Sequence, residues 1–182
     1  NELRIGEVWS SLSNSEDTLI IDRRHTDRRS VEVDLDQLMG EQVLVRKIRF
    51  DGRRSDRIST LETLSKWADI TLYDIGIDDY SRDEESNITL GRVEPQTVQN
   101  IKQRLGRRKI KSEFIQVIGE NVRFSSFKIT MPFKESDGEK LKVLRYDADT
   151  RNFSEEDFLV DKIEKTVTFH SSSPGIFVVV QE

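Results

Sequence analysis

Residues 127–182 contain four short runs rich in β-branched and aromatic residues: Phe127-Lys-Ile-Thr-Met-Pro-Phe133, Leu141-Lys-Val-Leu-Arg-Tyr-Asp147, Thr166-Val-Thr-Phe-His170 and Ser173-Pro-Gly-Ile-Phe-Val-Val-Val180. Turn-forming residues separate these runs, at 136–138, 147–149 and 171–175. Short runs of this composition, bounded by turns, are typical of antiparallel strands packed in a β-sandwich.

The final run differs from the others because its apolar residues do not alternate with polar ones. Ile176-Phe-Val-Val-Val180 is apolar throughout, which indicates a central strand covered on both faces. Successive side chains of a strand point to opposite faces. We therefore expect Phe177 and Val179 on one face, and Ile176, Val178 and Val180 on the other.

The earlier part of the chain also contains strand-like runs. They occupy 5–9, 18–21, 31–35, 43–50, 70–77 and 114–118. The run 31–35 alternates with period two, which is typical of a half-buried strand. With the last third of the chain, these runs predict a mainly β protein.

Two segments show a helical period instead. Ile58, Leu61 and Leu64 recur at a spacing of three residues, which predicts a short helix over 58–68. Pro95 and Gly106 stand where prolines begin helices and glycines end them, which predicts a second helix over 95–105. A strand follows each segment, so a weak internal repeat is expected. The overall prediction is an antiparallel β-sandwich with two short helices, divided into an N-terminal β-rich region (1–112) and a C-terminal sandwich module (113–182).

The composition excludes several classes of site. The chain has 182 residues, of which 35% are hydrophobic and 35% charged, and it carries a net charge of −5. It has no cysteine, so disulfides, thiolate metal sites and cysteine nucleophiles are excluded. No apolar stretch approaches the roughly 20 residues of a membrane-spanning helix. Because the chain begins abruptly at Asn1, we expect it to be a piece of a longer protein.

The motifs of the last third resemble those of a known group of proteins. Ile129-Thr-Met-Pro-Phe133, Leu141-Lys-Val-Leu-Arg-Tyr-Asp147 with Phe153, and Thr166–Phe169 with Ile176–Val180 are similar to β-sandwich modules near the C-termini of large secreted surface proteins of Gram-positive bacteria, themselves similar to the ZU5 domain. The resemblance implies an extracellular or cell-surface location and a structural or adhesive role beside neighbouring domains. Some ZU5 relatives cleave themselves at a serine, but here glycine (Gly175) holds that position.

One basic segment is a candidate binding site. Its six residues have no acidic residue between them: Lys102, Arg104, Arg107, Arg108, Lys109 and Lys111. Guanidinium groups match phosphate and sulfate geometry, so the segment predicts a polyanion site for a cell-wall glycan or teichoic acid. The alternative is a solvated helix end, where basic residues interact favourably with the helix dipole. No aromatic residues interleave with the cluster, which disfavours single-stranded nucleic acid as the ligand.

Other candidate sites are weaker. Trp9, Trp67, Tyr73 and Tyr80 are candidates for a sugar-stacking platform, although core packing is the default for Trp67. The acidic loops at 78–86 and 147–152 contain possible calcium ligands, but the second departs from the EF-hand pattern and is better interpreted as a hairpin turn. The two histidines, His25 and His170, form no metal-binding spacing. We expect no metal site and no cofactor.

The sequence leaves three function classes, in order of preference. The first is a non-catalytic structural or adhesive module of a larger extracellular or cell-surface protein. The second is a carbohydrate- or polyanion-binding module. The third is an enzyme domain, which we do not expect because no phosphate loop, Gly-x-Ser-x-Gly elbow or His-Glu-x-x-His motif is present.

Overall fold

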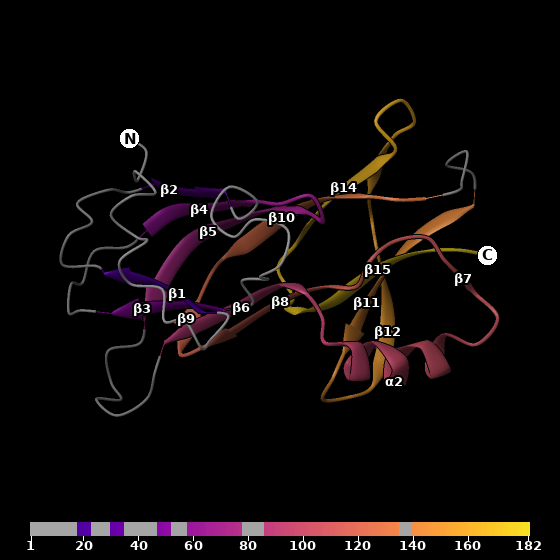
Figure 1. Cartoon of the computed structure of the whole chain (residues 1–182), viewed down its shortest axis with the longest axis horizontal. Helices are drawn as coiled ribbons and strands as arrows, with labels where there is room; N and C mark the ends of the chain where they lie inside the picture. Colours follow the sequence, from indigo (N-terminus) through magenta and orange to yellow (C-terminus); the bar gives the residue numbers. More distant parts are fainter. Residues whose placement is uncertain (1–17, 23–29, 35–46, 52–57, 78–85, 135–139) are drawn as a thin grey trace.

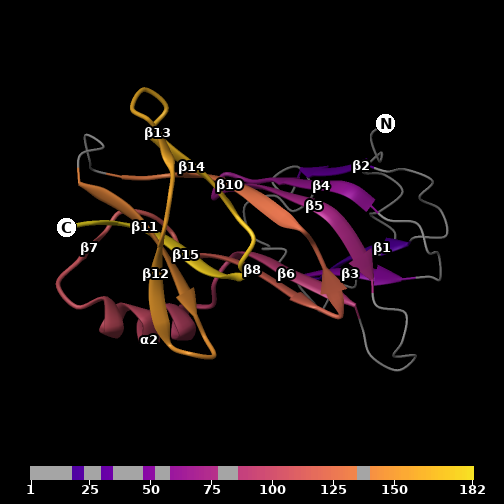
Figure 2. The ribbon, with the colours of Figure 1, turned by 180° about the vertical axis from the view of Figure 1, so that it is seen from behind.

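The computed structural model describes residues 18–22, 30–34, 47–51, 58–77, 86–134 and 140–182. These residues form two β-sheets and one α-helix, α2 (Pro95–Leu105). The predicted mainly β class and two-sheet arrangement are confirmed (Figures 1 and 2). The predicted strand at 5–9 lies outside the described residues.

Sheet A has eight strands. Seven of them lie side by side in the order β1 (Thr18–Asp22), β3 (Lys47–Asp51), β6 (Asn87–Arg92), β8 (Ile115–Glu120), β15 (Gly175–Gln181), β11 (Leu141–Asp147) and β12 (Asn152–Glu156). The eighth, β7 (Lys109–Ile110), pairs with the C-terminal end of β15, at Val180 and Gln181.

Sheet B has seven strands. Six follow the order β13 (Leu159–Asp161), β14 (Thr166–Ser171), β10 (Ser126–Pro132), β5 (Asp69–Ile77), β4 (Ile58–Leu64) and β2 (Ser30–Asp34), and β9 (Val122–Arg123) pairs with β5. Among the described strands, pairing is antiparallel except between β1 and β3 and between β2 and β4, which are parallel. The antiparallel prediction is therefore correct for most pairs.

The larger hydrophobic core lies between the two sheets. Its aromatic centre is Phe177 on β15, whose ring centroid is 5.6 Å from that of Phe127 on β10 and 5.2 Å from that of Phe169 on β14. Rings from both sheets therefore meet at the middle of this inter-sheet core, and all three are buried.

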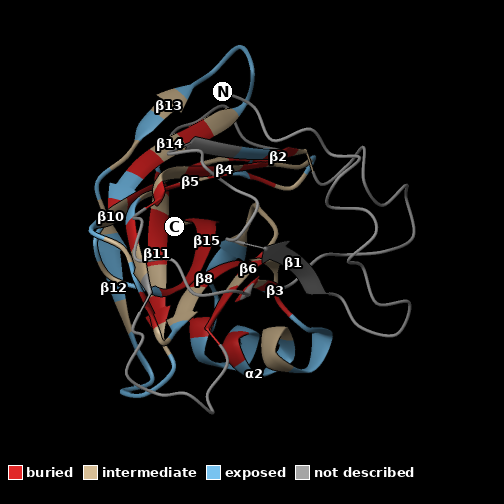
Figure 3. Cartoon of the chain, turned by 90° about the vertical axis from the view of Figure 1, so that its left-hand side faces the viewer, coloured by how far each residue is buried: buried red, intermediate tan, exposed pale blue. Residues whose placement is uncertain are grey.

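A smaller, outer core lies on the other face of sheet A, where α2 covers it. Ile101 and Leu105 of α2 pack with Ile176, Val178 and Val180 of β15. Figure 3 shows the buried side of α2 turned toward the sheet. The final strand is thus covered on both faces, with Phe177 and Val179 in the inter-sheet core, and the predicted assignment of its five side chains is confirmed.

The helix predicted at 58–68 is wrong, because 58–64 is strand β4, followed by a short turn into β5. β4 pairs with β5 on one side and β2 on the other. Ile58 and Leu61 are three residues apart, so in a regular strand their side chains would point to opposite faces, yet both are buried. This is why their spacing looks helical in the sequence. The β4–β5 register omits the pair formed by Ser59 and Asp74, where Asp74 has a φ of 53°, outside the β region. The alternation of buried and exposed side chains is interrupted at this pair. The predicted helix–strand repeat is also wrong, because its first helix is a strand.

The helix predicted at 95–105 is confirmed as α2, with Pro95 in its first turn and Gly106 after its end. Gly106 has a φ of 65°, a value that residues with a Cβ rarely adopt.

Strands from both sides of residue 112 share the two sheets. In sheet A β6 pairs with β8, and in sheet B β5 pairs with β10. Within the described residues, 1–112 and 113–182 therefore contribute to the same inter-sheet core. Their separation into two domains stays a prediction, which a fragment experiment tests (Discussion).

Candidate functional site

The basic surface consists of the six sequence-predicted residues, which lie at the end of α2 and along β7. Five are exposed and Lys111 is half-buried: Lys102, Arg104, Arg107, Arg108, Lys109 and Lys111. Ile101 and Leu105 turn the apolar side of α2 toward sheet A, which leaves Lys102 and Arg104 on the outside. The chain then turns at Gly106 and brings Arg107 and Arg108 directly before β7.

Backbone hydrogen bonds hold this segment against the sheet. The Lys111 N–H donates to the carbonyl of Val179 on β15, at 2.8 Å. The Lys111 carbonyl accepts from the N–H of Lys134, at 2.7 Å. The backbone is therefore attached to strand β15 at Lys111, three residues after Arg108.

Charge is segregated onto this segment. Residues 95–112 carry six basic residues and no acidic one, a charge of +6, while the whole chain carries −5, which leaves −11 for the rest. Lys134 and Lys140 are linked to this region by backbone hydrogen bonds, Lys134 to Lys111 and Lys140 to Glu182. They are not part of the basic surface as defined, because Glu135, Asp137 and Glu139 stand between them in the sequence. A localised positive region on an acidic chain attracts anionic ligands.

One carboxylate already contacts the basic surface. Oε1 of Glu182 lies 3.9 Å from Nε of Arg108 and 3.1 Å from Nζ of Lys142 on β11. Lys142 also donates to Oε1 of Glu155 on β12, at 2.8 Å. The hydrogen bonds to Glu155 and then to Glu182 raise the pKa of Lys142.

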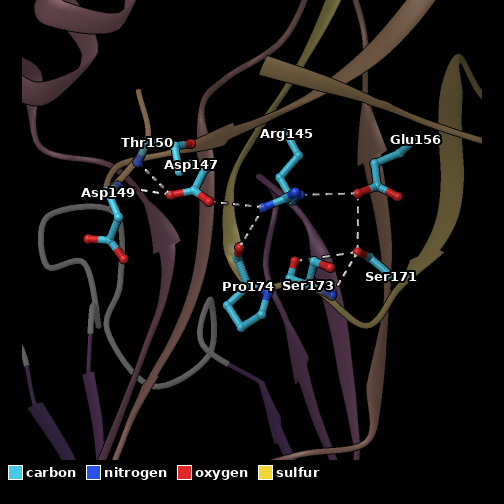
Figure 4. Close-up of polar contacts among 8 residues, drawn as sticks. All are labelled: Arg145, Asp147, Asp149, Thr150, Glu156, Ser171, Ser173 and Pro174. Carbon is cyan, nitrogen blue, oxygen red and sulfur yellow. Dashed lines mark hydrogen bonds and ion pairs between the residues drawn. The ribbon is translucent and has the colours of Figure 1, made fainter. Parts of the chain in front are cut away.

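A second polar cluster lies where the sheets meet, at inward-facing positions. We call Arg145 of β11, Glu156 of β12 and Ser171 of β14 the polar brace (Figure 4). Nε of Arg145 lies 3.6 Å from Oε1 of Glu156, and the Ser171 hydroxyl donates to that same oxygen at 3.2 Å. Because β12 belongs to sheet A and β14 to sheet B, Glu156 links the two sheets.

Arg145 makes further contacts along the strand ends. Its Nη1 donates to the carbonyl of Pro174 at 3.3 Å and lies 3.9 Å from Oδ2 of Asp147. Its Nε is buried and makes no hydrogen bond within the described residues. A Cβ on Gly175 would lie 2.9 Å from Cγ of Arg145 and 2.8 Å from the carbonyl oxygen of Tyr146, so a glycine is needed for the arginine to cross this strand.

The environments of the two carboxylates beside Arg145 shift their pKa values in opposite directions. Burial raises the pKa of Glu156, and this effect outweighs the opposing effects of the Ser171 hydrogen bond and the Arg145 charge. The pKa of Asp147 is lowered, because the backbone N–H groups of Thr150 and Asp149 donate to its carboxylate. These two hydrogen bonds, at 3.2 Å and 2.9 Å, form the turn between β11 and β12.

The predicted hairpin at 147–152 is confirmed, since Tyr146 and Phe153 are paired across β11 and β12. Within the described ranges no group of three or more metal-ligating side chains forms a metal site. Most of the acidic loop at 78–86, including Asp78 and Asp79, lies outside the described residues.

Of the four proposed sugar-stacking residues, the structure describes Trp67 and Tyr73, which lies on β5. Trp67 is half-buried against the inter-sheet core. The Arg92 guanidinium lies 4.2 Å from the centroid of its ring, and Nζ of Lys66 lies 4.8 Å from it. Its ring is thus engaged in cation–π contacts. Trp9 and Tyr80 lie outside the described residues. His170 is an exposed residue within β14, and His25 lies outside the described residues.

Sequence reasoning missed the polar brace. Its three members are separated by 11 and 15 residues, so no local motif contains them. A signal was nonetheless present, since Arg145 interrupts the run Leu141–Tyr146 at a position that shares the strand face of Val143. A basic residue on the buried face of a strand needs a partner.

The fold and these sites define a mainly β protein of two packed sheets, with a helix over the outer face of sheet A. No protein-family model matches the sequence, and no curated protein matches it. In the described part of the chain no helix is long and apolar enough to cross a membrane.

Proposed function

We propose that this chain is a non-catalytic structural or adhesive module of a larger extracellular or cell-surface protein. The observation that carries the proposal is the polar brace, in which buried and half-buried polar groups of both sheets contact one another and the backbone. These contacts join sheet A to sheet B, which suits a structural role. The resemblance of the last third to modules of secreted surface proteins supports the location.

Antibody labelling of source cells tests the location. An antiserum raised against the folded chain should label intact cells as strongly as permeabilised cells. Labelling that requires permeabilisation would contradict the proposal, as would turnover of a substrate by the purified chain.

A specific observation favours a second function, binding of a polyanion. The basic surface places five exposed cations on a segment of charge +6, and that segment contains no acidic residue. Arginine forks bind phosphate and sulfate groups well, and binding to a chain of such groups weakens as salt is added. Teichoic acid and acidic cell-wall glycans are ligands of this chemistry.

The second function is tested by comparing two double variants that lose the same charge. Arg107→Ala with Arg108→Ala should weaken binding to a teichoic acid or acidic-glycan array and reduce its salt dependence. Lys162→Ala with Lys165→Ala, exposed residues of the β13–β14 turn, should leave both unchanged. Equal loss in both variants would show that net charge, and not this surface, governs binding.

A further inference from the structure

We infer that the carboxylate of Glu182 holds the place that a phosphate or sulfate group of the ligand takes in the bound state. In this view Arg108 and Lys142 form one anion subsite, which Glu182 fills in the free protein. The inference rests on the polyanion-binding function proposed above. It adds that the Glu182 carboxylate competes with the ligand for this subsite.

The geometry of the subsite supports this exchange. A single oxygen, Oε1 of Glu182, contacts nitrogen atoms of two residues from different parts of the chain, Arg108 at 3.9 Å and Lys142 at 3.1 Å. The same position suits an oxygen of a tetrahedral anion, which the two cations would contact from two sides. Lys142 keeps its bond to Glu155 when Glu182 leaves, since an ammonium group has three donors.

The contact is also easy to open. The side chains of Arg108 and Glu182 are 39% and 47% exposed, so their attraction is screened by water and salt. The backbone of Glu182 is held by a hydrogen bond from its N–H to the carbonyl of Lys140, at 3.3 Å. A rotation of the side chain alone would therefore free the subsite and leave the strand pairing intact.

The arrangement of the neighbouring cations indicates the class of ligand. Lys102 and Arg104 lie on the last turn of α2, Arg107 and Arg108 follow it, and Lys109 begins β7. Four further exposed cations, close in sequence to the Arg108 that forms the closed subsite, suit a flexible chain of repeated anionic groups better than a single small anion. Its charged groups are phosphodiesters or sulfates, which share the tetrahedral oxyanion.

The experiment compares Glu182→Gln with Glu164→Gln, which removes the same charge from the exposed β13–β14 turn. Affinity for linear polyphosphate and for heparin is measured at roughly 50 mM salt. Glu182→Gln should bind about two- to fivefold more tightly than the unsubstituted chain, a gain that corresponds to opening a surface ion pair. Glu164→Gln should bind unchanged. The two probes separate phosphate-bearing from sulfate-bearing ligands.

A double-mutant cycle completes the test. In the background of Arg108→Ala, the gain from Glu182→Gln should disappear, because the subsite is then lost. If both Gln variants gain equally, or neither gains while the unsubstituted chain binds through Arg107 and Arg108, Glu182 is no competitor and the polyanion function stands without it. If no variant binds either probe, both proposals fail. Binding by Glu182→Gln alone would support the inference strongly.

Discussion

At the scale of single residues, Arg145 constrains the residue types around it, because its side chain needs space and polar partners. Its stem crosses Gly175 closely, its guanidinium lies between Glu156 and Asp147, and its Nη1 bonds to the Pro174 carbonyl. Because the arginine faces inward at the end of the inter-sheet core, each of these contacts compensates part of its desolvation.

Gly175→Ala should lower the free energy of unfolding by about 1–3 kcal/mol, the usual cost of overpacking. The added methyl would stand 2.8 Å from the backbone oxygen of Tyr146, which cannot rotate away. Gly76→Ala is the matched control, since a Cβ there meets nothing within 4 Å, and it should leave stability unchanged or raise it by up to about 1 kcal/mol. Urea unfolding of both variants measures the difference, and equal effects would contradict the close contact at Gly175.

Glu156 should make stability depend on pH in a defined direction. Its pKa is raised in the folded chain, so ionisation costs more there than in the unfolded chain. The associated stability is present at low pH and is lost as the pH rises through the folded-state pKa. Relative to Glu156→Gln, the unsubstituted chain should therefore gain stability as the pH falls from about neutral toward the ordinary value of 4.5.

Denaturant unfolding of both proteins across this range measures the gain, with Glu164→Gln as the control, because Glu164 is exposed and does not contribute to the pKa shift of Glu156. The comparison between variants removes contributions from other carboxylates, including Asp147, whose lowered pKa acts in the opposite direction. A difference between the proteins that stays constant with pH would mean that Glu156 is not desolvated by the brace.

At the scale of elements, β15 is the strand on which both cores depend. Phe177 and Val179 belong to the inter-sheet core, while Ile176, Val178 and Val180 belong to the outer core under α2. The strand pairs with β11 along one side and with β8 and β7 along the other. No described face or side of its apolar centre is left to water, which explains its uninterrupted apolar sequence.

Val178→Asp should unfold the protein or come close to doing so. Val178 is 1% exposed, and an uncompensated buried charge costs about 3–5 kcal/mol, against a total stability of about 5–15 kcal/mol for a typical domain. Leu159→Asp introduces the same residue on strand β13, where Leu159 is 77% exposed, and should change stability by no more than about 0.5 kcal/mol. Thermal melting separates the two variants, and a Val178→Asp melting temperature near that of Leu159→Asp would place β15 at an exposed edge.

At the scale of the whole molecule, the sheets are built from strands that lie far apart in the chain. The inter-sheet core combines Leu61 and Ile70 with Phe127 and Phe177. Figure 1 shows the early strands β4 and β5 beside the late strand β10. Folding must therefore close long loops before most of the apolar surface is buried, which favours slow folding.

The fragment 113–182 should fail to fold when it is made alone. Without β6 and β5, strands β8 and β10 each lose one of their two neighbouring strands, and the inter-sheet core around Phe127 loses the members that residues before 113 supply. The near-ultraviolet circular dichroism of the fragment should lack sharp bands, and its melting should not be cooperative. A cooperative melt would establish 113–182 as an independent domain, as the sequence predicts.

Local signals explain which predictions the structure confirms. Period-two alternation, turn residues and helix-end residues act over a few positions, so the strands of the last third, the hairpin at 147–152 and the helix bounded by Pro95 and Gly106 were all predictable. The two-sided burial of β15 followed from its composition alone. The six basic residues were also predictable as a cluster, because they lie within ten residues of one another and exposed side chains need no distant partner.

Long-range pairing explains the rest. The segment 58–64 becomes a strand because β2 and β5 pair with it on both sides, and pairing overrides a helical spacing of three apolar residues. Arg145, Glu156 and Ser171, like Arg108 and Glu182, meet only after distant strands have aligned. Side-chain contacts of this kind depend on register and sheet order, which are properties of the folded chain as a whole, and local sequence does not encode them.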